Sequence, residues 1–198
     1  MKIIDIELSA VHVNHRGDWV FVHVRTDEGI SGIGELKAGR NYGAQVTAVR
    51  DMKPQLIGRD PRRIESIFAD FKTSDRAQLS ALSAIDQALW DIKGKALNTP
   101  VWNLLGGKIR DRIRAYGHAK TPERALELKA QGLTAIKTGG VHRVADQVED
   151  IRNAVGNEID IMVDAHGPPW HNTKDAIIVG KSLEQFNLLF YEDPVPPD

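Results

Sequence analysis

The sequence predicts an α+β domain, built from an antiparallel meander plus helices, followed by the first half of a (β/α)8 TIM-type barrel. Two observations lead to this prediction. In the amino-terminal part, stretches with apolar residues at every second position come first and helical periodicity follows them. From about residue 112, strand-like and helix-like segments alternate, which is typical of parallel strands joined by right-handed crossovers. We therefore expect two domains, 1–110 and 111–198.

The first domain is expected to begin with three strands. Apolar and polar residues alternate over residues 4–10, and two further apolar-rich stretches cover residues 19–25 and 31–36. The last two are separated by Asp27-Glu28-Gly29, a sequence that favours a turn. Short strands joined by turns predict an antiparallel meander.

Helices should follow the meander. Helical periodicity begins after Tyr42, and the first helix is expected to end near Pro54. Pro61 and Pro100 are each expected at the first position of a helix, where a missing N–H costs nothing. The longest helix should run from about Asp75 to Leu97. It carries one apolar stripe at spacings of three and four residues, formed by Leu82, Ile85, Leu89, Ile92 and Ala96.

The second domain is expected to hold four parallel strands. They are predicted within residues 112–118, 134–138, 159–167 and 188–194. The helices between them should start after Thr121, run through Val144 to Val155, and run from about Thr173 to Gln185. A complete barrel takes about 250 residues. Since the sequence stops at Asp198, we expect a chain truncated after the fourth barrel strand.

Composition limits the possible partners. The chain has 26 basic and 27 acidic residues and a formal net charge of -1, so we expect neither nucleic acid nor an anionic membrane as a partner. It has no cysteine, which removes disulfides, thiolate ligands and a cysteine nucleophile. Asp5 and Glu7 interrupt the apolar run that a secretory signal requires. We therefore expect a cytoplasmic protein.

Two acidic residues follow successive strands. Asp164 and Glu192 each come at the carboxyl end of a predicted strand. Two carboxylates about 4 Å apart would repel by roughly 4 kcal/mol at an effective dielectric constant near 20. Either one of them takes up a proton or a bound cation offsets this repulsion. Oxygen ligands without thiolate favour Mg²⁺. Because side chains alternate along a strand, His166 should point the same way as Asp164, and Lys137 the same way as Gly139.

Each of these residues also fits a purely structural role. An aspartate after a strand often caps a helix, and a glutamate before a proline turn is often exposed to solvent. A lysine at a strand end usually lies on the protein surface. His171, beside Trp170 in the loop GPPWHNT, either contacts substrate or covers the barrel rim. Arg16, in the turn VNHRGDW, is a substrate-binding candidate or an ordinary exposed arginine.

Residues 83–107 carry the string SAIDQALWDIKGKALNTPVWNLLGG. It closely resembles the signature of the mandelate racemase and muconate lactonizing enzyme group of the enolase superfamily. The resemblance implies an N-terminal capping domain over 1–110 and half of the barrel over 111–198. It also implies that Lys137 is the first lysine of the K-x-K motif, and that Asp164 and Glu192 are the first and second Mg²⁺ ligands. The third ligand and the later-strand base would then lie beyond Asp198.

One departure from the family pattern points to a reaction. Gly139 stands where the second lysine of K-x-K would be, which disfavours a racemase or cycloisomerase with a lysine base on that strand. Asp164 and His166 instead form a D-x-H pattern that resembles the acid-sugar dehydratases of the superfamily, in which the histidine acts as general acid on the departing hydroxyl group or helps to place it. The implied function is a Mg²⁺-dependent acid-sugar dehydratase, a hydro-lyase that removes an α-proton, stabilises an ene-diolate and expels water.

Two alternatives remain open. One is an acid-sugar epimerase or racemase of the same superfamily, with His166 in proton transfer. The other is a non-catalytic truncated fragment with an interaction role. The expected small-molecule partner is an acid sugar, and the chain alone is expected to be inactive. Unpaired barrel edges should favour a homo-oligomer or other self-association.

Overall fold

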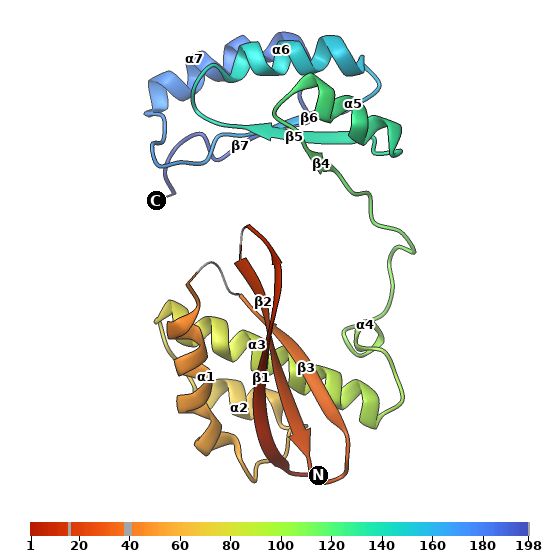
Figure 1. The fold of residues 1–198 in the computed structure, drawn as a ribbon, viewed down its shortest axis with the longest axis vertical. Coiled ribbons are helices and arrows are strands. Elements are labelled where there is room, and N and C mark those ends of the chain that lie inside the picture. The colour runs from red at the N-terminus through yellow and green to blue at the C-terminus, as the bar shows by residue number, and fades with distance from the viewer. Residues whose placement is uncertain (16, 38–40, 198) are drawn as a thin grey trace. The chain divides into compact units, whose positions relative to one another are not determined.

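The computed structural model describes residues 1–15, 17–37 and 41–197. The chain divides into two compact units, Met1–Ile109 and Arg110–Asp198, which Figure 1 shows as ribbons. The first unit holds an antiparallel sheet of order β1-β2-β3, and the second holds a parallel sheet of order β4-β5-β6-β7. This arrangement confirms the fold class predicted from the sequence. None of the helices in the described ranges combines the length and apolarity that a membrane crossing demands.

The first unit packs helices against one face of its sheet (Figure 1). Its strands are β1 (Ile3–Asn14), β2 (Gly17–Thr26) and β3 (Ser31–Leu36). Its helices are α1 (Gly43–Leu56), α2 (Ile64–Asp70), α3 (Arg76–Ala96) and α4 (Val101–Leu104). The buried positions of β2 alternate, as expected for a strand with one face on a core. Its buried residues on the helix side are Val20, Val22 and Val24.

Helix α3 lies directly on β3, at the edge of the sheet. A Cβ atom added to Gly34 would lie 1.9 Å from the carbonyl oxygen of Ala84, so only glycine permits this approach. The helix also supplies partners for the strand: Ile33 N–H donates to Asp91 at 3.0 Å and Glu35 N–H donates to Gln87 at 3.0 Å. Side chains of α3 therefore satisfy an edge that would otherwise be free to pair with another chain.

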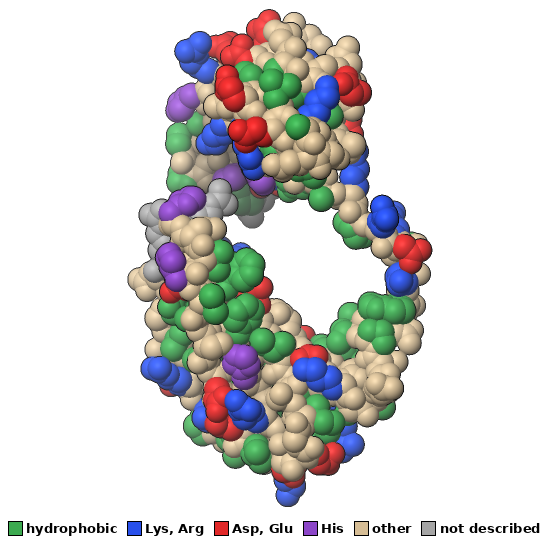
Figure 2. Space-filling model, turned by 45° about the vertical axis from the view of Figure 1, so that its right-hand side comes forward, with side chains coloured by type: hydrophobic (Ala, Val, Ile, Leu, Met, Phe, Trp, Pro, Cys, Tyr) green, Lys and Arg blue, Asp and Glu red, His purple; other side chains and the backbone are tan. Residues whose placement is uncertain are grey.

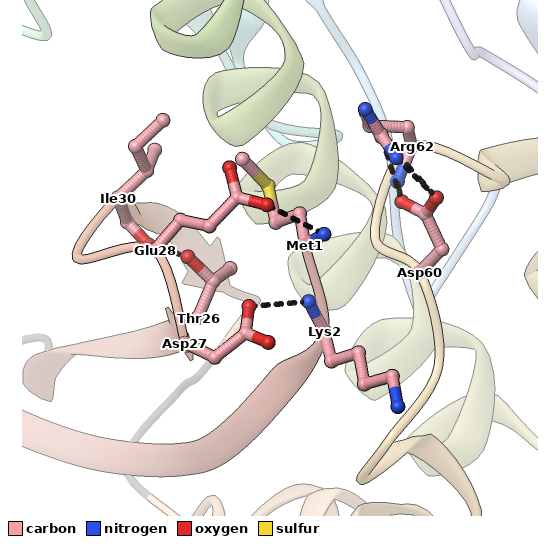
Figure 3. A network of polar contacts seen from close by, with 8 residues as sticks. All are labelled: Met1, Lys2, Thr26, Asp27, Glu28, Ile30, Asp60 and Arg62. Carbon is pink, nitrogen blue, oxygen red and sulfur yellow. Dashed lines mark hydrogen bonds and ion pairs between the residues drawn. The ribbon is translucent and has the colours of Figure 1, made fainter.

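A polar network fixes the start of β1 to the turn between β2 and β3 (Figure 3). The amino group of Met1 lies 2.6 Å from Glu28 Oε1, and the backbone N–H of Lys2 donates to Asp27 Oδ1 at 2.7 Å. Thr26 Oγ1 donates to the carbonyl oxygen of Ile30 at 2.7 Å, which closes the turn itself. These contacts fix the start of the first strand to the turn between the second and third strands.

The helix starts agree with the sequence prediction at some positions and differ at others. Asp75 caps α3 by accepting from the Gln78 N–H at 2.9 Å, as expected for an N-cap aspartate. The helix predicted to open at Pro61 was placed wrongly, because α2 begins at Ile64. The side chain of Asp60 instead bonds the backbone N–H and guanidinium of Arg62 and forms a turn there (Figure 3). Pro100 is the N-cap of α4 rather than its first residue.

The second unit repeats strand and helix. Its strands are β4 (Gly117–His118), β5 (Ala135–Gly139), β6 (Asp160–Asp164) and β7 (Phe190–Glu192). Its helices are α5 (Pro122–Ala130), α6 (Val144–Val155), α7 (Thr173–Leu183) and the 3-10 turn η1 (Glu184–Phe186). The helices lie along one face of the sheet (Figure 1). On that face they bury a core that includes Leu128, Ile136, Val148, Ile151, Ile161 and Leu183.

The first strand of this unit is shorter than predicted. Residues 112–118 were expected to form it, but only Gly117 and His118 pair with β5. Upstream, the guanidinium of Arg114 donates to Thr134 Oγ1 at 2.8 Å and contacts Asp160 Oδ2 at 2.6 Å. Side-chain bonds thus hold this segment where ladder bonds were expected, and Ile113 is left 81% exposed.

Charged side chains of both signs are interspersed on the surface visible in Figure 2. Neither sign forms a continuous patch on that face. Positive and negative side chains are therefore mixed on the visible face, in keeping with the near-zero net charge of the whole chain.

Candidate active site and metal centre

Strands β5, β6 and β7 end at the same edge of the parallel sheet. Gly139 pairs with Asp164, and Asp164 pairs with Glu192, so the three strand ends form one row. Lys137 lies two residues before Gly139 and shares its face, because side chains alternate along a strand. The register therefore directs Lys137, Asp164 and Glu192 to one place.

These three side chains meet in a compact ionic cluster. The ammonium nitrogen of Lys137 lies 2.8 Å from Asp164 Oδ2 and 2.6 Å from Glu192 Oε2. Lys137 is only 8% exposed, although it is charged. The structure thus brings together three of the residues singled out in the sequence, and it does not place Lys137 on the surface.

A further acidic residue joins the cluster. One carboxylate oxygen each from Asp164, Glu192 and Asp193 lie within 4.8 Å of one another. Asp193 has a left-handed backbone conformation, with φ 46°, directly after β7. Asp193 was not predicted from the sequence, where the available signal is its position beside Glu192 in YEDP. Carboxylate oxygens in such a group are ligands of the kind that a hard divalent cation takes.

The charges in the cluster stabilise one another. Burial alone would raise the pKa of Asp164, but hydrogen bonds from Lys137 and His166 outweigh it and hold that pKa at about 2. Burial likewise opposes a charge on Lys137, yet its bonds to Asp164 and Glu192 prevail and raise its pKa. At neutral pH the cluster therefore contains an ammonium ion between carboxylates.

His166 is attached to the cluster through Asp164. Its Nδ1 lies 2.6 Å from Asp164 Oδ1, and its backbone N–H donates to the same oxygen at 3.3 Å. A histidine whose Nδ1–H donates to a carboxylate has its ring fixed and its Nε2 directed elsewhere. Because the His166 side chain is 66% exposed, its Nε2 is open to a bound molecule.

Gly139 stands where no side chain fits. A Cβ atom added there would lie 2.1 Å from the backbone oxygen of Asp164. A second lysine at this position would therefore push β6 away from β5. The close approach gives a physical reason for glycine at this point of the chain.

The remaining sequence candidates lie apart from these contacts or outside the described residues. The backbone N–H of His171 donates to the carbonyl oxygen of Pro194 at 3.1 Å and so links the loop after β6 to the segment after β7. Within the described ranges, neither His171 Nε2 nor Trp170 Nε1 has a hydrogen-bond partner, and both atoms are buried. Arg16 lies outside the described residues.

Two aromatic side chains at the start of the second unit, Tyr116 just before β4 and His118 within it, were also missed. The ring of Tyr116 lies 5.9 Å from the Lys137 ammonium nitrogen and 5.5 Å from the ring of His118, at an interplanar angle of 58°. His118 pairs in register with Lys137, so both belong to the same row of the sheet. The signal was the alternation within AYGH, which puts Tyr116 and His118 on one face.

Comparison with known proteins places this geometry in a family. Residues 5–106 match the N-terminal domain of mandelate racemase / muconate lactonizing enzyme, and residues 120–198 match the enolase C-terminal domain-like family. A D-galactonate dehydratase of Klebsiella pneumoniae (strain 342) is 38% identical over 201 residues, which cover 89% of this chain and 52% of the relative. The chain thus spans about half the length of the curated relatives it matches.

Solved structures agree with the sequence comparison. An enolase of the mandelate racemase subgroup from Agrobacterium tumefaciens is 35% identical, with a TM-score of 0.83 over 98% of this chain and 58% of that one. The 3,6-anhydro-D-galactonate cycloisomerase of Zobellia galactanivorans is 29% identical, with a TM-score of 0.88 over 100% of this chain and 60% of that one. The chain therefore belongs to the mandelate racemase/muconate lactonizing enzyme group of the enolase superfamily.

Proposed function

We propose that the strand-end cluster is the metal and acid-catalysis part of a Mg²⁺-dependent acid-sugar dehydratase. The observation that carries this proposal is the convergence of Asp164 and Glu192 on one ammonium ion, with His166 bonded to the same aspartate. We also propose that residues 1–110 serve as a capping domain and that residues 111–198 supply part of a barrel. The two family matches support this division.

The metal assignment rests on the chemistry of the donors. Asp164 and Glu192 would hold Mg²⁺, and Asp193 offers a further oxygen within the same group. When bound, such an ion supplies Lewis-acid stabilisation of the ene-diolate that forms when a carboxylic acid loses its α-proton. Carboxylates this close to one another need a cation in any case, and Lys137 provides only one positive charge.

Lys137 and His166 have separate roles in the proposed reaction. The ammonium group of Lys137 would attract the substrate carboxylate and the negative charge that develops on it. His166, fixed through Nδ1 by Asp164, would donate a proton from Nε2 to the departing hydroxyl group, which leaves as water. We assign removal of the α-proton to a base outside these 198 residues, as the family resemblance implies. The product would be a 2-keto-3-deoxy acid.

The substrate class follows from the relatives. Two dehydratases named for D-galactonate are 38% and 36% identical to this chain. We therefore propose an aldonic or related polyhydroxy acid, with D-galactonate as the first compound to test. His171 and Arg16 remain candidates for contacts to its hydroxyl groups.

The test uses a protein that extends this chain to the length of its relatives. It is incubated with Mg²⁺ and a panel of aldonic acids, and formation of the 2-keto-3-deoxy acid is measured. We expect dehydration of at least one member of the panel, lost in Asp164→Asn and retained in Asp175→Asn, which removes an exposed carboxylate from α7. Retained dehydration by Asp164→Asn would contradict the proposal.

A second candidate reaction is isomerisation of an acid sugar. The match to a 3,6-anhydro-D-galactonate cycloisomerase favours it, and His166 would then take part in proton transfer. Gly139 argues against a lysine base on β5. The same panel separates the reactions, since an epimer or a cyclic product would appear in place of the keto acid.

We further propose that the 198-residue chain alone is inactive. Among the residues that the structure describes, the outermost strands β4 and β7 each have a sheet partner on one side only, and Phe190 of β7 is 41% exposed. Such edges favour association with another chain. A non-catalytic role as an interacting fragment would be supported if this chain bound a defined partner through these edges.

A further inference from the structure

Lys137 occupies the oxygen atoms that a metal would need. It contacts Asp164 through Oδ2 and Glu192 through Oε2. The other oxygen of Asp164, Oδ1, is bonded to His166 Nδ1 at 2.6 Å. Protein donors therefore use both oxygens of Asp164. A cation that takes the positions next to Asp164 Oδ2 and Glu192 Oε2 must therefore displace the ammonium group.

Charge makes this exchange necessary. A divalent cation placed on the same oxygens would lie close to the Lys137 ammonium ion, and like charges at such distances repel strongly in a partly buried site. Lys137 and Asp164 have side chains only 10% and 14% exposed, so water screens them poorly. The ammonium ion and the metal therefore compete for one pair of carboxylates.

Tyr116 offers the displaced ammonium a second partner. Its ring face lies 5.9 Å from the Lys137 nitrogen, within the range of a cation–π contact. The Tyr116 ring also contacts the ring of His118, a residue that pairs in register with Lys137. An aromatic ring attracts an ammonium ion without offering a ligand that would hold Mg²⁺, so it favours Lys137 over the metal.

We propose that Lys137 is the resident counter-cation of the metal-free site, that a divalent cation displaces it from Asp164 and Glu192, and that Tyr116 is the positioning residue that keeps it beside the site after the exchange. The inference rests on the proposed function, because it takes the two carboxylates as metal ligands. It goes further by giving Lys137 an effect on metal affinity that is opposite to its effect on catalysis. Lys137 would weaken metal binding and still be needed for the reaction.

The first test measures Mg²⁺ binding by titration calorimetry at neutral pH. Lys137→Met should bind Mg²⁺ about tenfold more tightly than the unchanged chain, or more, which corresponds to about 1.4 kcal/mol. The control is Lys181→Met, which removes the same charge from an exposed position on α7. Equal or weaker binding by Lys137→Met would overturn the inference and leave the metal site in place. No binding by either protein would remove the metal site itself, and the inference with it.

The second test needs no variant of Lys137 that could fail to fold. Nuclear magnetic resonance of the lysine side chains follows the Lys137 ammonium signal of the unchanged chain during addition of Mg²⁺. We expect that signal to shift, while the signal of Lys129, paired with Glu158, stays in place. An unchanged Lys137 signal at saturating Mg²⁺ would refute the exchange.

The role of Tyr116 is tested in the metal-loaded chain. Ring-current shifts of the Lys137 methylene protons report how near the aromatic face remains. They should persist in Tyr116→Phe, which keeps the ring, and disappear in Tyr116→Leu. Equal shifts in both variants would show that Tyr116 does not position Lys137.

Discussion

Replacing Gly139 by alanine should separate β5 from β6 at the candidate site. The added Cβ would lie 2.1 Å from the backbone oxygen of Asp164, far inside a normal contact, and that oxygen belongs to the main chain and cannot rotate away. Overpacking of this kind costs about 1–3 kcal/mol. We therefore expect Gly139→Ala to lower the free energy of unfolding of the second unit by that amount. It should also draw Asp164 away from Lys137.

Hydrogen exchange measured by mass spectrometry can localise the effect. Amide exchange should accelerate in β5 and β6 of Gly139→Ala while the first unit keeps its native rate. The control is Gly34→Ala, whose Cβ would lie 1.9 Å from the Ala84 oxygen and should destabilise the first unit alone. Native exchange in β6 of Gly139→Ala, together with unchanged stability, would show that the strands have room for a side chain. Close approach of β5 and β6 would then not explain why Gly139 stands in place of a second lysine.

The remaining predictions concern the proposed reaction. In a protein extended to the length of its relatives, Lys137→Met should lower kcat/KM by about 10²-fold or more, and an effect below twofold in steady-state assays would exclude a role for the ammonium group. His166→Asn should stop the loss of water but permit exchange of the substrate α-proton in D₂O, whereas dehydration at the parental rate would reject His166 as the acid. The 198-residue chain should show no turnover and should self-associate on a sizing column; a monomer that turns over an acid sugar at about 1 s⁻¹ or faster would contradict that expectation.

Much of the fold could be predicted from the sequence because it depends on patterns among neighbouring residues. The apolar stripe of α3 predicted a buried face, and Leu82, Ile85, Leu89 and Ile92 are buried, whereas Ala96 at the end of the helix is exposed. Helix starts that have a capping side chain could also be predicted from the sequence. Thr121, for example, caps α5 by accepting from the Arg124 N–H at 3.3 Å. In both cases neighbours within one or two helical turns decide the structure, and the sequence contains them all.

The errors arose where particular side-chain bonds, distant or local, override the pattern of the sequence. Strand 112–118 was predicted from its composition, but Arg114 bonds to Thr134 and Asp160, which are far away in sequence. The start of α2 was misplaced because the Asp60 carboxylate bonds Arg62 instead of a helix amide. In the site, the sequence indicated which residues end the strands, but not that one lysine would lie between two carboxylates.

The most direct test of the account is a crystal structure of this chain soaked with Mn²⁺, a divalent cation that can be located by its anomalous scattering. We predict an anomalous peak coordinated by carboxylate oxygens of Asp164 and Glu192, with the Lys137 ammonium group no longer in contact with either. Peaks only elsewhere, with the Lys137 ammonium nitrogen still 2.8 Å from Asp164 Oδ2 and 2.6 Å from Glu192 Oε2, would contradict this prediction.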